Sequence, residues 1–169
     1  MKQKPIVAFG LSICLVVFCL SQYVHARSEA DDGVIDSFIT KQAKKEKAVE
    51  YKDARTIMRG DLNGDGKEDV VALYTLESFK GTNLYLQYLA IFIRDSGNLR
   101  RVTHQIVGGK NRRVVGLKSA INGEIHLDTQ EYLPKDASCC PSKKGNTRFS
   151  LIRGKLREIE IDESATSRD

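Results

Sequence analysis

The sequence is poor in the residues and motifs on which enzyme active sites depend. Its 169 residues include three histidines and four cysteines. They contain no Gly-x-Ser-x-Gly, His-Glu-x-x-His, phosphate-loop or dinucleotide-loop motif. The cysteines form no Cys-x-x-Cys pair, which argues against a redox or soft-metal site. We therefore predict no catalytic residues and expect that the protein is not an enzyme.

The sequence also lacks a large excess of charge of one sign. The chain has 27 basic and 22 acidic residues, a formal net charge of +5. Lys2 and Lys4 belong to an expected signal peptide, described below. Without them 25 basic residues remain against 22 acidic ones, a net charge of about +3. The basic residues are scattered along the sequence, which is typical of a solvated surface. We expect no binding to nucleic acid, and contact with an anionic envelope surface is the alternative for these residues.

No apolar run reaches the length of about 20 residues that a membrane-spanning helix needs. The longest one extends from Ile6 to Leu20, after Lys2 and Lys4. This pattern predicts a signal peptide over residues 1–26, with cleavage after Ala26. The mature protein is then periplasmic or secreted and has no stable membrane span. A retained anchor and a lipoprotein are the alternatives.

The rest of the chain predicts one α+β domain over residues 27–162, followed by a frayed tail at residues 163–169. Apolar residues at helical spacing predict one N-terminal helix from Asp31 to Glu50. Mostly antiparallel β structure follows, a meander or sandwich of roughly seven or eight strands. Asn122-Gly123 is the strongest hairpin signal. The expected strands are residues 54–60, 70–74, 84–93, 99–107, 114–121, 124–132, 147–152 and 156–161.

The most distinctive segment is Asp61-Leu62-Asn63-Gly64-Asp65-Gly66-Lys67-Glu68-Asp69. Alternate residues of a turn can direct oxygen atoms at one centre, as a hard cation such as Ca²⁺ requires, and Gly66 occupies the place of the sharp turn. The expected ligands are the side chains of Asp61, Asn63, Asp65 and Asp69 and the backbone carbonyl of Lys67.

The pattern Asp61-x-Asn63-x-Asp65-Gly66-x-x-Asp69, followed by an apolar strand, resembles the calcium-binding hairpin of FG-GAP/VCBS (integrin-like) repeats. The resemblance covers residues 55–74 and a single repeat, whereas a propeller needs several. It implies one Ca²⁺ bound by the five residues named above. An EF-hand is not expected, because Ala72 replaces the bidentate glutamate and the flanking runs look like strands. A hydrated turn without an ion is the alternative.

Cys139 and Cys140 are the only cysteines that remain after the expected cleavage, and they lie in an expected loop over residues 134–146. An exported protein meets an oxidising compartment, in which these residues could pair only with each other. Such a vicinal disulfide is strained, because adjacent Cα atoms lie about 3.8 Å apart. Free or partner-linked thiols and a redox or soft-metal site are the alternatives.

Together these features predict an exported binding or structural module that is stabilised by one Ca²⁺ and recognises an unknown envelope or extracellular ligand. One alternative is an envelope enzyme or enzyme accessory. It would use the face formed by His126 and Asp128, which lie two residues apart on an expected strand. A thiol-based sensor that uses Cys139 and Cys140 is the other alternative.

Overall fold

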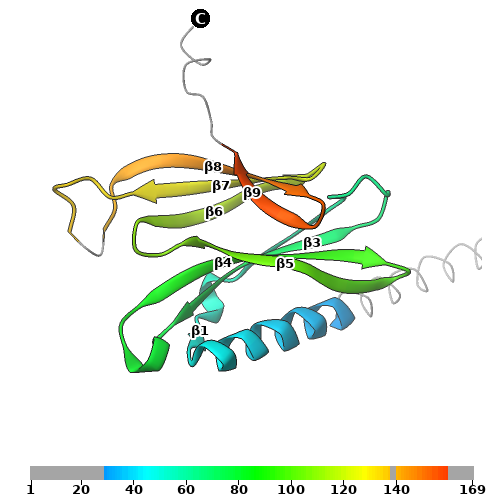
Figure 1. The fold of residues 1–169 in the computed structure, drawn as a ribbon, viewed down its shortest axis with the longest axis horizontal. Helices are drawn as coiled ribbons and strands as arrows, with labels where there is room; N and C mark the ends of the chain where they lie inside the picture. The colour runs from blue at the N-terminus through cyan, green and yellow to red at the C-terminus, as the bar shows by residue number, and fades with distance from the viewer. Residues whose placement is uncertain (1–28, 138–139, 160–169) are drawn as a thin grey trace, which may run out of the picture. The chain divides into compact units, whose positions relative to one another are not determined.

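The computed structural model describes residues 29–137 and 140–159. Within these residues the protein is mostly β, with nine strands in two antiparallel sheets and one N-terminal helix, which confirms the predicted α+β class (Figure 1). The expected signal peptide over residues 1–26, its cleavage site after Ala26 and the expected tail over residues 163–169 lie outside the described residues.

The N-terminal helix covers residues 29–46. The boundary between two compact units of the chain falls within this helix, between Ser37 and Phe38. The unit that begins at Phe38 contains both sheets. In this unit Ile39 and Ala43 are buried, as expected for two residues four apart on one helix face. No helix of the described residues is long and apolar enough to cross a membrane.

The helix ends at residue 46 rather than at Glu50 for a local reason. Lys47 adopts a left-handed conformation with φ of 53°, and the Ala48 N–H donates to the Ala43 carbonyl at 2.9 Å. This is the hydrogen bond that closes a helix C-terminus before the chain turns away. Residues 49 and 50 then form the first strand instead of a further helical turn.

The first sheet, called sheet 1 below, has the strand order β1-β3-β4-β5, with β2 also paired to β3. Its strands are β1 (Val49–Glu50), β2 (Thr56–Gly60), β3 (Asp69–Glu77), β4 (Tyr85–Asp95) and β5 (Asn98–Gly108). β1 pairs with the end of β3 and β2 with its beginning, and a short 3-10 helix, η1 (Lys52–Ala54), lies between them in sequence. β4 lies between β3 and β5, and consecutive residues of this strand are buried, so both of its faces are covered.

The second sheet, called sheet 2 below, is a meander with the order β6-β7-β8-β9. Its strands are β6 (Arg112–Ile121), β7 (Glu124–Glu131), β8 (Lys143–Ile152) and β9 (Lys155–Ile159). The Asn122-Gly123 hairpin is confirmed, and both residues have the positive φ that a two-residue turn of this type requires. β8 begins at Lys143 rather than at Thr147, because residues 143–146 continue the pairing with β7.

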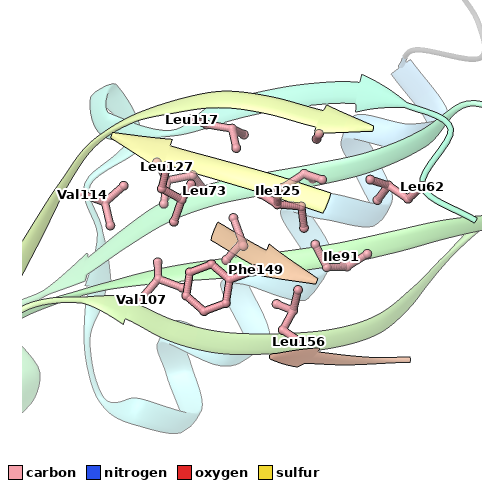
Figure 2. Packing of buried hydrophobic residues seen from close by; sticks show 13 residues of the cluster. Leu62, Leu73, Ile91, Val107, Val114, Leu117, Ile125, Leu127, Phe149 and Leu156 are labelled. Atoms are coloured by element: carbon pink, nitrogen blue, oxygen red, sulfur yellow. The ribbon is translucent and has the colours of Figure 1, made fainter. Parts of the chain in front are cut away.

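The main core lies between the two sheets, where each contributes one apolar face (Figure 2). Alternate residues of a strand point to the same face, so core residues recur at every second position on strands such as β7, with Ile125 and Leu127. On β6, where the pairing with β7 shifts register, they are Val114, Leu117 and Ala120. Close packing of these side chains holds the sheets together. The labelled members of this cluster are Leu62, Leu73, Ile91, Val107, Val114, Leu117, Ile125, Leu127, Phe149 and Leu156.

The other face of sheet 1 carries aromatic side chains that pack against the helix. Phe38 lies edge-on to Phe92, with ring centroids 5.6 Å apart, and Tyr74 stacks on Tyr88 at 5.2 Å. His104 also packs edge-on against Phe38 at 5.4 Å. Burial lowers the pKa of His104 below its usual value, which favours the neutral ring. These aromatic side chains therefore serve packing.

Candidate functional site

The segment from Asp61 to Glu68 connects β2 to β3. These strands pair antiparallel up to Gly60 and Asp69, so the segment is the loop of a hairpin. Strands therefore flank it on both sides, as the sequence predicts, and not the helices of an EF-hand.

The Asp61 carboxylate organises this loop. Its Oδ1 accepts hydrogen bonds from the N–H groups of Asn63 at 3.2 Å and Gly64 at 2.7 Å, and its Oδ2 accepts one from Gly66 at 2.9 Å. These bonds, led by the one from Gly66, lower the pKa of Asp61. Gly64 and Gly66 have φ of 78° and 75°, a region that favours glycine.

Asn63 and Asp65 repeat the same kind of turn at two-residue intervals. The Asn63 Oδ1 accepts from the Asp65 N–H at 3.1 Å, and the Asp65 Oδ1 accepts from the Lys67 N–H at 2.9 Å. The Lys67 ammonium contacts the Asp65 Oδ2 at 3.1 Å. The hydrogen bond from the Lys67 backbone is the main cause that lowers the pKa of Asp65. Both carboxylates are thus held in their charged form.

Asp69 behaves differently from the other acidic residues of the loop. Its side chain is fully buried, and its Oδ2 and Oδ1 accept from the N–H groups of Leu62 at 3.0 Å and Arg94 at 2.8 Å. This carboxylate therefore joins the start of the loop to β4. It lies at the base of the loop, whereas Asn63 and Asp65 are exposed.

The geometry of the loop meets the requirements of a cation site only in part. Asp61, Asn63, Asp65 and Lys67 lie in one turn that their hydrogen bonds connect. Asp69 is engaged beneath them, and no group of three or more His, Cys, Asp or Glu side chains in the described residues is arranged to hold a metal. An ionised carboxylate has about four acceptor positions. The side chains of the turn thus retain acceptor capacity for an ion beyond their hydrogen bonds to the backbone.

Three further residues fix the loop to the body of the protein, and the sequence analysis missed them. Leu62 is only 3% exposed and belongs to the inter-sheet core. The Asp61 carbonyl accepts from the Asn122 N–H at 3.0 Å, in the turn between β6 and β7. The buried Arg94 donates from its Nε to the Glu68 carbonyl at 2.9 Å. An apolar residue in an otherwise polar loop was the available signal for Leu62.

The face with His126 and Asp128 does not bring these two side chains together as a hydrogen-bonded pair. The His126 Nε2 contacts a Glu124 carboxylate oxygen at 3.2 Å, and the Asp128 Oδ1 contacts the Lys118 ammonium at 3.3 Å. All four side chains are substantially exposed. Pairs of this kind are typical of a solvated sheet surface.

The loop before β8 contains the two cysteines. Cys139 lies outside the described residues, so its pairing with Cys140 stays a prediction. The Cys140 N–H donates to the Ala137 carbonyl at 2.9 Å. Asp136 holds the neighbouring backbone, because its Oδ2 accepts from the N–H groups of Leu133 and Ser142, each at 2.8 Å.

No protein-family model, curated protein or solved structure matches the chain. The resemblance of the loop to FG-GAP/VCBS repeats therefore stays a prediction from residues 55–74.

Proposed function

We propose that this protein is an exported binding or structural module stabilised by one Ca²⁺ in the loop between β2 and β3. The observation that carries the proposal is the fold of the loop around Asp61. Its carboxylate accepts from the Gly66 N–H at 2.9 Å, and Gly66 makes the sharp turn with φ of 75°. This arrangement supports alternate side chains around one centre, as a calcium loop requires.

The ligand atoms suit calcium better than a softer metal. The loop offers the oxygens of Asp61, Asn63 and Asp65, the Lys67 carbonyl and Asp69 from below, and a hard cation prefers oxygen. Water can complete the shell on the exposed side of the loop. The three carboxylates exceed the charge of a divalent ion, and the Lys67 ammonium next to Asp65 offsets part of that excess.

A bound ion would stabilise several parts of the fold through one loop. The loop closes the β2–β3 hairpin, contacts β4 through Arg94 and contacts the β6–β7 turn through Asn122. An ion that binds only the folded state adds about 2.7 kcal/mol of stability at 100 times its dissociation constant. Weak sites of this type are filled outside the cell, where calcium reaches millimolar concentrations.

Thermal unfolding of the purified protein in EDTA and in millimolar calcium tests this proposal. We expect calcium to raise the midpoint in the wild type and to have no effect in Asp65→Ala. Asp95→Ala is the matched control, because Asp95 is an exposed aspartate of another hairpin turn, and this variant should keep the response. No calcium response in the wild type would make the segment an ordinary turn.

Export has its own test. The proposed signal peptide comprises residues 1–26, so the protein recovered from the periplasm or medium of an expressing bacterium should begin at Arg27. Recovery of the whole chain in the cytoplasm, with Met1 retained, would contradict this part of the proposal.

A further inference from the structure

A cavity of about 740 Å³ lies at the end of β3 that is remote from the proposed calcium loop. It has the size of small-ligand sites, which commonly occupy about 300–1,000 Å³. Its lining comes from both sheets: β3 and β4 on one side, β6 on the other, and the segment around η1. The site is thus built from residues that are distant in sequence.

Polar side chains of β3 form the floor of this cavity. They lie in a row on the face of the strand that, further along, contributes apolar side chains to the core. On β3 the row passes from Leu73 in the core to Thr75 and Glu77, which line the cavity. Their partners on β4 are Gln87 and Tyr85. Thr75 is only 7% exposed and Glu77 is half-buried. The row thus changes from an apolar residue of the inter-sheet core to two polar residues that line the cavity.

Gln87 keeps the two sides of the cavity in fixed register. Its side-chain Nε2 donates to the Val114 carbonyl at 2.8 Å, and its Oε1 accepts from the Val114 N–H at 2.7 Å. A buried amide that is paired in both directions is a rigid link between β4 and β6. The cavity is therefore preformed, which lowers the entropic cost of ligand binding.

Three charged side chains line this cavity, the carboxylates of Asp53 and Glu77 and the guanidinium of Arg113. Among the described residues, the side chains of Glu77 on β3 and Arg113 on β6 take part in no hydrogen bond or ion pair. The Thr75 hydroxyl also has no hydrogen-bond partner there. Arg113 opposes the effect of burial on the pKa of Tyr85, so its charge acts on the floor of the cavity. A carboxylate that loses water without gaining a partner favours a ligand that supplies one.

We propose that this cavity binds a small zwitterion, an amino acid or short peptide, whose ammonium pairs with Glu77 and whose carboxylate pairs with Arg113. The Thr75 and Tyr85 hydroxyls would contact the polar groups between the two charged ends. Charge-assisted hydrogen bonds at both ends would supply affinity and orientation. The site goes beyond the proposed calcium loop and does not depend on it, because the two lie at opposite ends of β3.

Trialanine is the probe, and its binding is followed by two-dimensional ¹H–¹⁵N spectra of the full folded protein. We expect changes at Thr75, Gln87 and Val114. Trialanine amide, which lacks the carboxylate, and N-acetyl-trialanine, which lacks the ammonium, should each bind at least roughly tenfold more weakly. Maltotriose, a neutral hydroxyl-rich probe, should leave these signals unchanged.

Matched substitutions identify the contacts. Arg113→Gln and Glu77→Gln should each weaken trialanine binding, and Arg100→Gln, an exposed arginine of β5 outside the cavity, should not. The Arg113→Gln variant should bind trialanine and trialanine amide equally. The substitution and the amide each remove the same contact between the ligand carboxylate and Arg113. No spectral change at millimolar trialanine, equal binding of the amide by the wild type, or preference for maltotriose would overturn the proposal.

Discussion

β3 carries a carboxylate at each end on the same face of the strand, and the two carboxylates have opposite surroundings. Asp69 and Glu77 belong to one row of alternate residues. Asp69 is fully buried and accepts two backbone hydrogen bonds, from Leu62 and Arg94. Glu77 is half-buried and lines a cavity, and its carboxylate has no hydrogen-bond or ion-pair partner among the described residues.

The Asp69 carboxylate therefore stabilises the fold, whereas the Glu77 carboxylate is available to pair with a ligand. Removing a buried acceptor leaves its donors without water and without a partner, which is costly. Removing a charge that the protein does not pair costs the folded state little. The comparison therefore predicts large effects at the start of β3 and small ones at its end, unless a ligand is present.

The largest effect is expected from Asp69→Ala. The substitution leaves the N–H groups of Leu62 and Arg94 without an acceptor, and each buried unsatisfied group costs about 1–3 kcal/mol. Chemical denaturation in EDTA should therefore show a loss of roughly 2–6 kcal/mol without any contribution from calcium. Glu77→Gln is the matched control and should change stability by less than about 0.5 kcal/mol. Equal losses in the two variants would remove the distinction.

A smaller loss is expected from Gly66→Ala. The φ of 75° at this position costs a residue with a Cβ about 1–2 kcal/mol, although no atom lies close enough to clash. Gly33→Ala is the control, because Gly33 lies in the helix and alanine there should raise stability by up to about 1 kcal/mol. Chemical denaturation measures both, and an unchanged Gly66→Ala variant would show that the turn is not constrained.

Acid should lower the stability of the protein through Asp61, in the loop that precedes β3. Hydrogen bonds from the loop backbone lower the pKa of this carboxyl in the folded state. Its contribution to stability is therefore complete above the unfolded pKa of about 3.9 and is lost as the pH falls through the lower folded value. Asp61→Asn should show a flatter loss of stability below about pH 4 than the wild type. A parallel pH profile in the two proteins would contradict this assignment.

The smallest effect is expected from Arg113→Gln without ligand. The guanidinium has no partner among the described residues, so its loss should change the free energy of unfolding by less than about 0.5 kcal/mol. The same substitution should raise the pKa of Tyr85 further, because the charge that opposes the effect of burial is removed. Spectroscopic titration of the tyrosines measures this change, and a lower Tyr85 pKa would place Arg113 away from the cavity.

The sequence predicted those parts of the fold that depend on local pattern. The expected strand ranges overlap most of the observed strands, and Asn122-Gly123 located a hairpin. β8 was predicted too short, because residues 143–146 are polar and their pairing with β7 has no local signature. The end of the helix at residue 46 depends on a single left-handed lysine.

The contacts around the two sites could not be predicted, because they join segments that are distant in sequence. The bond between the Asp61 carbonyl and Asn122 requires knowing that sheet 2 packs beside the loop. The link between Gln87 and Val114 requires the relative position of β4 and β6. Spacing alone also could not show that the Asp69 carboxylate accepts hydrogen bonds from the backbone of Leu62 and Arg94, and its role as a calcium ligand stays a prediction.

A calcium titration followed by two-dimensional ¹H–¹⁵N spectra tests the central claim most directly. The account predicts that calcium changes the signals of Asp61 to Asp69 and of Asn122, and leaves those of Thr75, Gln87 and Val114 in place. Unchanged loop signals at millimolar calcium would contradict the account, and so would calcium-induced changes centred on the cavity at the other end of β3.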